Sequence, residues 1–390
     1  MSAGPWDTAA MLRRTPLVLV WAAGALACSV VPNARPGGDE LGDADTSDTD
    51  GGSSSESGST GDTTTGETGE TSDSTDETTA GCTESIPGPP TNESYSFEIG
   101  GQLAWSHDAG SPAGWFHTYD ALDLGDPYGG PHKVHVLLPR NYDPCGPGYG
   151  VVYMNDGESS FWPGGAANKS WDVPGGLAQL YADGALEPLI VVAVEPNDRD
   201  YEYSHTPWAP NADPCCGVAE YADWLADEVH GFITANYRTQ LGPTHTAIVG
   251  SSRGGLGAFY VANARPDVFG GAGCMSSSFW LGLDPVYGGN YSGTLAESLL
   301  IELLDGTLSD PQLRPRLWID WGLIRTGGFH NEVIEEAATV RGIEMVGLLQ
   351  EKYGYVVDDE LFWLEDPQGE HDELSWGRRF PDVMLALFGP

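Results

Sequence analysis

The stretch "TAIVGSSRGG", residues 246–255, decides how the folded part of this chain is interpreted. A short apolar run ends at Gly250, and Ser252 stands between that glycine and Gly254. The bare pattern Gly-x-Ser-x-Gly is weak evidence in a chain with 53 glycines among 390 residues. The surroundings must therefore show whether Ser252 is a turn residue or a nucleophile.

Residues 1–28 have the pattern of a secretory signal. Two arginines precede the apolar run "PLVLVWAAGALA" at 16–27, which is too short to span a bilayer comfortably. Cys28, directly after small residues, resembles a bacterial lipobox cysteine, and Ser29 beside it fits outer-membrane sorting. We predict that Cys28 is lipidated and that the protein is an outward-facing lipoprotein of the cell envelope. An ordinary signal peptide and secretion are the alternative.

Residues 29–87 are predicted to be a disordered acidic linker. Between Asp39 and Ala80 the chain contains thirteen acids, no base and only three apolar residues. Such a segment cannot bury enough apolar surface to offset the entropy lost on ordering. Repulsion between its charges makes it an extended tether. Contact with the membrane is expected only through the lipid anchor.

Residues 88–390 are predicted to be one folded domain, because about 300 residues suffice for a single large core. A net charge of −40 argues against nucleic acid as a partner, since phosphate binding needs a basic footprint. The cysteine spacing matches no zinc pattern, and we predict neither a metal nor a cofactor. Cys274 lies in an apolar run and is expected to be a buried free thiol. The four remaining cysteines could form two disulfides with three possible connectivities: Cys82, Cys145, Cys215 and Cys216.

Apolar runs typical of strands alternate with helical patterns along this domain. This order predicts an α/β fold, a mostly parallel central sheet with helices on both faces. Ligands bind such sheets at the carboxyl ends of the strands. The expected strands lie within 131–142, 149–157, 188–196, 246–250, 316–322 and 361–366, and the expected helices within 173–186, 217–237, 255–266, 331–355 and 380–388.

Ser252 follows a buried strand and precedes a helix, which is the position of a nucleophile on a strand-to-helix elbow. Gly250 and Gly254 would relieve the crowding of the sharp turn. A serine hydroxyl needs a base that a third group orients, and in this architecture the chain order is Ser, acid, His. Only His330 and His371 follow Ser252. His371 lies between the last expected strand and the last helix, so we predict it to be the base.

Four segments together resemble the putative-esterase family, which includes enterochelin, feruloyl and acetylxylan esterases, esterase D and mycolyl-transferring surface antigens. The resemblance covers most of the chain from about residue 130 to the end. It implies an α/β-hydrolase fold and carboxylic-ester chemistry. The segments are "YMNDG" (153–157), "EYADWLADEVHGFITANYRT" (220–239), "AIVGSSRGGLGAFYVANARPDVFG" (247–270) and "GEHDELSWGRRFPDVMLALFG" (369–389).

By that resemblance, the backbone amides of Arg253 and Glu158 form an oxyanion hole, worth roughly 3 kcal/mol for each donor. Asp156 is interpreted as a turn residue. The segment "NDRDYEYSH" (197–205) resembles a family segment near the cleft, in which Arg199 and Glu202 would pair.

The orienting acid is where the sequence departs from the family pattern. Asp or Glu is expected about three residues after Gly322, where this chain has "LIR". We place Glu332 first as the acid and Asp320 second. Glu335, one helical turn beyond Glu332, is a third candidate.

The sequence thus predicts an exported serine esterase that hydrolyses small or polysaccharide-linked carboxylic esters through an acyl-enzyme. An acyltransferase of the same fold and a non-catalytic surface binding lipoprotein are the alternatives. Several aromatic residues in loops near strand ends could stack on sugars or aryl acids, or could simply pack the loops. They are Trp162, Trp171, Tyr203, Trp208, Phe279, Trp280 and Trp376.

Overall fold

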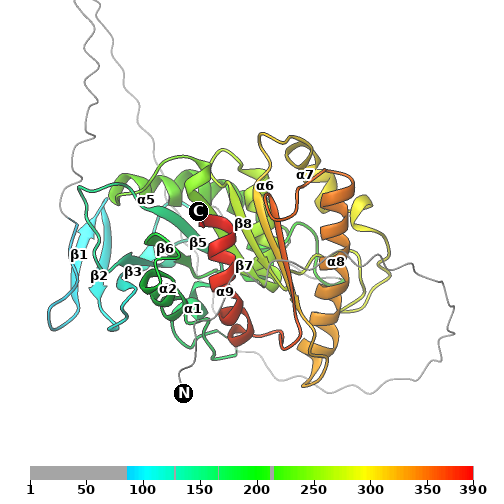
Figure 1. Ribbon diagram of the computed structural model, residues 1–390, viewed down its shortest axis with the longest axis horizontal. Coiled ribbons are helices and arrows are strands. Elements are labelled where there is room, and N and C mark those ends of the chain that lie inside the picture. Colours follow the sequence, from blue (N-terminus) through cyan, green and yellow to red (C-terminus); the bar gives the residue numbers. More distant parts are fainter. Residues whose placement is uncertain (1–85, 127–128, 166, 211–214, 390) are drawn as a thin grey trace, which may run out of the picture. The chain divides into compact units, whose positions relative to one another are not determined.

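The structure is a computed structural model that describes residues 86–389 apart from 127–128, 166 and 211–214 (Figure 1). The predicted signal peptide, its Cys28 and nearly all of the linker lie outside these described residues. Among the described residues, no helix combines the length and apolarity needed to cross a membrane.

One ten-stranded mixed sheet organises the domain, in the order β1-β2-β3-β4-β6-β5-β7-β8-β9-β10. Strands β1 to β4 and the β4–β6 pair are antiparallel, and all pairs from β6 to β10 are parallel. The expected α/β class is confirmed. The strands are β1 (Tyr95–Ile99), β2 (Gln102–His107), β3 (Gly114–Leu122), β4 (His132–Pro139), β5 (Gly150–Met154), β6 (Leu189–Val194), β7 (Thr246–Ser251), β8 (Gly271–Met275), β9 (Arg316–Gly322) and β10 (Leu361–Asp366).

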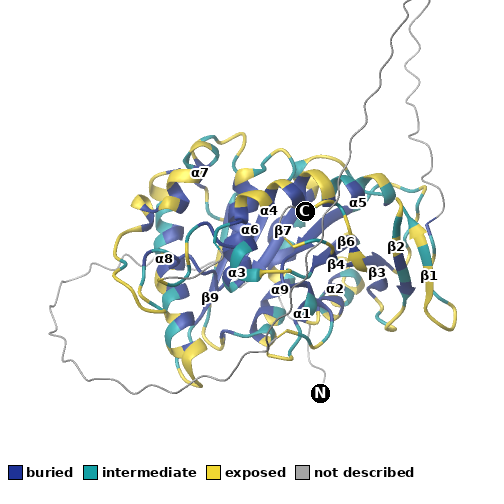
Figure 2. Cartoon of the chain, turned by 180° about the vertical axis from the view of Figure 1, so that it is seen from behind, coloured by how far each residue is buried: buried dark blue, intermediate teal, exposed yellow. Residues whose placement is uncertain are grey.

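The central strands are apolar throughout because both of their faces are covered. In β6 every residue is buried, and successive side chains enter two different core clusters. Ile190 and Val192 belong to one cluster, and Val191 and Ala193 to the other. This alternation follows from the two-residue period of a strand. Figure 2 shows these strands dark blue behind helices whose outer surfaces are exposed.

Helices supply the other side of each core cluster. Helices α2 and α9 contribute to one, and α4 to α8 to the other. In Figure 1, α9 lies beside α2 in front of the central strands. The helices are α1 (Gly157–Ser160), α2 (Val173–Ala182), α3 (Arg199–Glu202), α4 (Val218–Trp224), η2 (Leu225–Val229), α5 (His230–Asn236), η3 (Pro243–His245), α6 (Ser252–Ala264), η4 (Leu295–Glu297), α7 (Leu299–Ser309), η5 (His330–Ile334), α8 (Glu335–Glu351) and α9 (Glu373–Phe388).

Several elements escaped the sequence analysis: strands β1 to β3, strand β8 and helix α7. Strand β8, "GAGCM", is rich in glycine, which is unfavourable in a strand. The structure gives the reason, because a Cβ on Gly273 would lie 2.7 Å from Val383 of α9 and 3.0 Å from Val249 of β7. Close packing of the helix and the neighbouring strand requires the glycine.

The cysteines agree in part with expectation. Cys274 is free and fully buried, as predicted. Cys215 and Cys216 are joined to each other, and Cys145 is also disulfide-bonded. Cys82 lies outside the described residues.

Candidate active site

Ser252 lies on a tight turn between β7 and α6. Its φ of 54° is in the left-handed region, which non-glycine residues rarely adopt and which is concentrated at functional sites. A Cβ on Gly250 would lie 2.3 Å from the carbonyl oxygen of Gly254, and a Cβ on Gly254 would lie 2.6 Å from Asp156. The two glycines therefore allow a turn that any larger residue would block.

His371 faces Ser252 from the loop between β10 and α9. The distance from His371 Nε2 to Ser252 Oγ is 2.9 Å, and His371 Nδ1 lies 2.5 Å from Glu335 Oε2. The backbone N–H of His371 donates to Asn331 Oδ1 at 2.8 Å, and its ring packs edge-on against Trp376. The imidazole is held by contacts on several sides.

Glu335, the first residue of α8, is completely buried. Its Oε1 accepts hydrogen bonds from Ser276 Oγ at 2.9 Å and from the backbone N–H of Gly322. Burial alone would raise the pKa of this carboxyl. The hydrogen bond and charge of His371, the Gly322 N–H and the charge of Arg379 outweigh burial, so the pKa lies below its usual value. A buried carboxylate is thus kept ionised beside the imidazole.

The structure does not bring the two favoured acids to His371. Glu332 bonds to the backbone N–H of Gly328 at 3.3 Å and is exposed. Asp320 is buried and pairs with Arg379 at 2.9 Å. Glu335, the third candidate, makes the contact. A π-helical turn, η5, which has more residues per turn than an α-helix, precedes α8. Spacing along the sequence does not reveal such a turn, so it does not show which carboxylate faces the histidine.

His330 lies near the site but is not the partner of Ser252. Its ring centroid is 5.9 Å from that of His371. Burial lowers the pKa of His330, with a further contribution from the neighbouring histidine.

Arg253 and Glu158 both stand at the first turn of a helix, α6 and α1 respectively. Backbone N–H groups at this position have no acceptor within the helix, which suits them to binding an oxyanion. The side chain of Arg253 points elsewhere, because it pairs with Asp200 and lies 5.2 Å from the ring centre of Trp208. Its amide, not its charge, is therefore the group that could serve the site.

The triad opens into a cavity of about 610 Å³, which both Glu158 and Trp376 line. Two cations of this cavity are already paired with its acids. Lys169 Nζ lies 2.8 Å from Asp372 Oδ2, and Arg199 binds both oxygens of Asp156 at 2.6 and 2.9 Å.

The expected pair of Arg199 with Glu202 is therefore wrong. Glu202 instead contacts His132 and accepts the backbone N–H groups of Asn197 and Asp198. Asp156 is thereby a partner of Arg199 at the turn after β5.

Most of the aromatic residues singled out in the sequence pack the loops. Trp162 and Trp208 are half-buried, and Trp376 is buried but lines the cavity. The others are buried: Trp171, Tyr203, Phe279 and Trp280.

Glu158 carries an unusual carboxyl. Burial, together with the nearby charge of Asp156, raises its pKa from the ordinary 4.5 to about 7. Its Oε2 is buried without a hydrogen-bond partner among the described residues. Because the pKa is higher in the folded state, folded-state stability should fall as pH rises from 4.5 to 7. Above pH 7 the cost reaches about 3 kcal/mol, at ~1.4 kcal/mol for each pKa unit.

Glu158→Gln is therefore expected to raise the free energy of unfolding at pH 8 by up to about 3 kcal/mol. At pH 4 the difference from wild type should nearly vanish, because the carboxyl is then mostly protonated in both states. Urea denaturation at the two pH values measures this. An equal effect at both would show that Glu158 is not destabilised by its charge.

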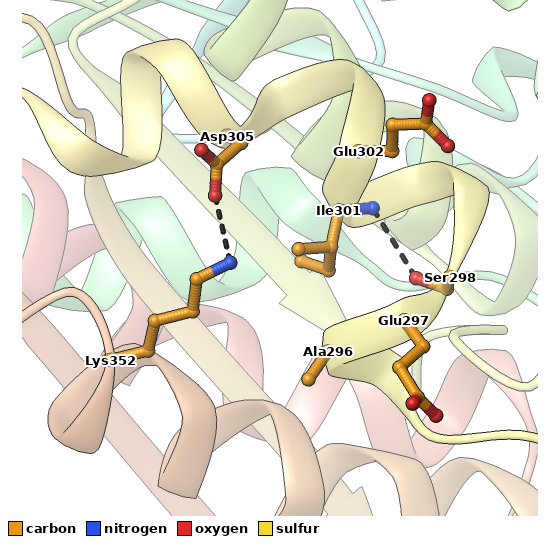
Figure 3. A pocket seen from close by; sticks show the side chains of 7 residues that line it. All are labelled: Ala296, Glu297, Ser298, Ile301, Glu302, Asp305 and Lys352. Atoms are coloured by element: carbon orange, nitrogen blue, oxygen red, sulfur yellow. Dashed lines mark hydrogen bonds and ion pairs between the residues drawn. The ribbon is translucent and has the colours of Figure 1, made fainter.

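A second cavity, of about 390 Å³, lies between η4, α7 and the end of α8 (Figure 3). It shares no residue with the triad cavity. Lys352 Nζ bonds to Asp305 Oδ1 at 2.8 Å, and the other charged side chains are Glu297 and Glu302. Among the described residues that line it, Ser298 supplies a hydroxyl, and this hydroxyl bonds to the backbone of Leu295 and Ile301, not to a base. The described residues also contain no group of three His, Cys, Asp or Glu side chains arranged to hold a metal ion.

A sheet whose strands from β6 to β10 are parallel, with a serine on a strained elbow, a histidine and a buried carboxylate, has the architecture of the α/β-hydrolase fold. The family described as "Putative esterase" matches residues 127–384. The chain belongs to this family.

Two relatives match parts of the chain. An uncharacterized protein, YbbA of Bacillus subtilis (strain 168), is 26% identical over 164 residues, 40% of this chain and 61% of YbbA. An endo-1,4-beta-xylanase/feruloyl esterase of Xylanibacter ruminicola is 28% identical over 156 residues, 38% of this chain and 20% of that protein. The chain thus spans less than two thirds of either relative.

Among solved structures, the BES protein from Bacillus cereus is similar, with a TM-score of 0.51 and 16% identity. The similarity covers 70% of this chain and 95% of that protein. At this identity the likeness concerns the fold.

Proposed function

We propose that the protein is a serine esterase that hydrolyses carboxylic esters through an acyl-enzyme. One observation carries the proposal: the unbroken chain of contacts from Ser252 Oγ through His371 to the buried Glu335. In this proposal Ser252 is the nucleophile, His371 the base and Glu335 the acid that orients it. Membership of the esterase family supports the reaction type.

In the first half of the reaction, Ser252 Oγ attacks the ester carbonyl carbon and its proton passes to His371 Nε2. The backbone N–H groups of Arg253 and Glu158 donate hydrogen bonds to the oxyanion that forms. The bond to the alcohol oxygen then breaks, and the alcohol leaves with the proton from His371. Water then attacks the acyl carbon and gives a proton to His371 Nε2. The bond to Ser252 Oγ breaks, Ser252 takes back that proton, and the carboxylic acid is released.

Capture of the same acyl group by a sugar hydroxyl instead of water would make the protein an acyltransferase. The discriminating experiment incubates the full-length protein with feruloyl, acetyl-sugar, catecholate-lactone and short aryl esters, with and without added sugar. Free acid as the main product is the expected result. Acyl-sugar as the main product would favour transfer, and no product from any ester would favour a non-catalytic binding protein.

We also propose that the protein is exported and anchored in the cell envelope through lipidated Cys28, with the acidic segment as its tether. The support is the sequence: a short apolar run ending in Cys28, followed by residues that cannot form a core. Several acyl chains on one cysteine give stable attachment where one alone is marginal.

Cys28→Ala is expected to move the protein out of the membrane fraction. Cell fractionation and immunodetection measure this. Wild-type protein already free in the medium would refute the anchor.

A further inference from the structure

Behind Glu335, on the side away from His371, lies a buried serine that follows β8. Ser276 Oγ donates to Glu335 Oε1 at 2.9 Å and is fully buried. Its φ of 42° is in the left-handed region. The backbone N–H of Ser276 bonds to Asp320, at 2.9 Å to the carbonyl oxygen and 3.1 Å to Oδ1. The hydroxyl is thus fixed from its own backbone, at a cost in local strain.

The same hydroxyl accepts a hydrogen bond from a buried arginine of α9. Arg379 Nη2 lies 3.0 Å from Ser276 Oγ and 2.9 Å from Asp320 Oδ1. Arg379 Nη1 donates to Asp366 Oδ2 at 3.2 Å. Only 3% of the arginine side chain is exposed. A cation is therefore held beneath the site by two carboxylates that do not contact His371.

These contacts make Ser276 a link between a charge and the triad. Its hydroxyl proton points to Glu335 because its oxygen accepts from the Arg379 guanidinium. A hydroxyl that accepts from a cation is a stronger donor, since hydrogen bonds in a chain polarise one another. The hydroxyl and the Gly322 N–H together occupy Oε1 and leave Oε2 for the imidazole.

We propose that Ser276 and Arg379 are positioning residues that hold Glu335 at hydrogen-bonding distance from His371 and limit how strongly the Glu335 carboxylate attracts the imidazole proton. This inference rests on the proposed serine-esterase function. It assigns Asp320 a part as well, because Asp320 fixes both Arg379 and the Ser276 backbone.

The charged groups around Ser276, Glu335 and Arg379, which we call the relay, bear on the pH dependence of the reaction. Glu335 faces His371 and Arg379, and behind the guanidinium stand Asp320 and Asp366. Around His371 the titratable neighbours are His330 of η5 and Glu370 of the same loop, whose Oε2 bonds to Asn331. The substitutions below leave His330 and Glu370 unchanged.

Ser276→Ala in the full-length protein is expected to lower kcat about tenfold, with KM nearly unchanged. This corresponds to an activation free energy higher by ~1.4 kcal/mol. The acid limb of the kcat/KM profile should move to higher pH by roughly 0.5, because a carboxylate that has lost a donor holds the imidazolium more tightly. Ser277→Ala is the matched control. Its hydroxyl is also buried but has no hydrogen-bond partner among the described residues.

A kcat and an acid limb for Ser276→Ala that match those of Ser277→Ala would overturn the proposal, as would a change in KM alone. Arg379→Met combined with Asp320→Asn removes the cation without changing the net charge of the cluster. It is expected to act in the same direction as Ser276→Ala. Adding Ser276→Ala to this pair should lower kcat by a smaller factor than it does in the wild type, because the effects of substituting residues that act through one another are not additive. Full additivity would also overturn the proposal.

Failure of this inference is distinguishable from failure of the proposed function. A wild-type protein that hydrolyses no ester, or a Ser252→Ala variant that remains active, would reject the function itself. If the wild type is active and the Ser276→Ala and Ser277→Ala variants have the same kcat and acid limb, only the positioning role of Ser276 and Arg379 is rejected. If the Arg379 variant does not fold, the two serine variants still decide, because each removes a single hydroxyl.

Discussion

Ser252→Ala is expected to lower kcat for ester hydrolysis by about 10^4- to 10^6-fold, because among the described residues Ser252 is the one whose hydroxyl bonds to His371 Nε2. A fluorophosphonate probe should label the wild-type protein at Ser252 alone and leave the variant unlabelled. Mass spectrometry of the labelled peptide and steady-state kinetics measure the two effects. The folded state should be kept, since alanine keeps the Cβ of the elbow residue.

Ser278→Ala is the control for this experiment. The Ser278 hydroxyl is 3.5 Å from Ser252 Oγ, so it is the neighbouring group that could substitute for it. Labelling of Ser278 in the Ser252→Ala variant, or turnover above one hundredth of wild type, would contradict the assignment of the nucleophile.

Glu335→Gln is expected to lower kcat by about 10^2- to 10^4-fold with little change in KM. The amide keeps the size of the side chain but cannot stabilise the imidazolium that forms when Ser252 attacks. Glu332→Gln, one turn earlier and exposed, removes the same charge and should leave kcat within about twofold of wild type.

Asp320→Asn separates support from catalysis in the same series. It should act mainly on thermal stability, because it leaves the buried Arg379 with one fewer carboxylate. It should lower kcat no more than Ser276→Ala does, because Asp320 acts on Glu335 only through Arg379 and Ser276. A larger loss of kcat in Glu332→Gln than in Glu335→Gln, with both proteins folded, would reject Glu335 as the acid.

The fold and the placement of Ser252 and His371 could be predicted because they depend on local patterns. Fully apolar runs identify strands covered on both faces, and the glycines around Ser252 identify a turn too tight for side chains. His371 followed from chain order, because only two histidines come after Ser252. The strand and turn signals each lie within a few residues, and the order of Ser252 and His371 can be read along the chain without knowing which residues are in contact.

The acid could not be fixed in the same way. Glu332, Glu335 and Asp320 are all carboxylates near the end of β9, and their roles depend on the π-helical turn and on which charge finds Arg379. The antiparallel edge strands β1 and β2 were missed because they partly face solvent, as Leu103 of β2 does with 70% exposure; β3 was missed although most of its residues are buried. Strand β8 was missed because it is rich in glycine, and Gly273 is required by close packing against Val383, which lies more than one hundred residues later in the chain.

The position of helix α9 makes the proposed activity depend on whether this helix stays packed against the sheet. This helix carries Arg379, begins just after His371 and lies against Gly273 through Val383. Any opening that releases it from the sheet would withdraw the base and the support of its acid in one event. Amide hydrogens of α9 should therefore exchange with solvent together, and their exchange would report how often each molecule is transiently inactive.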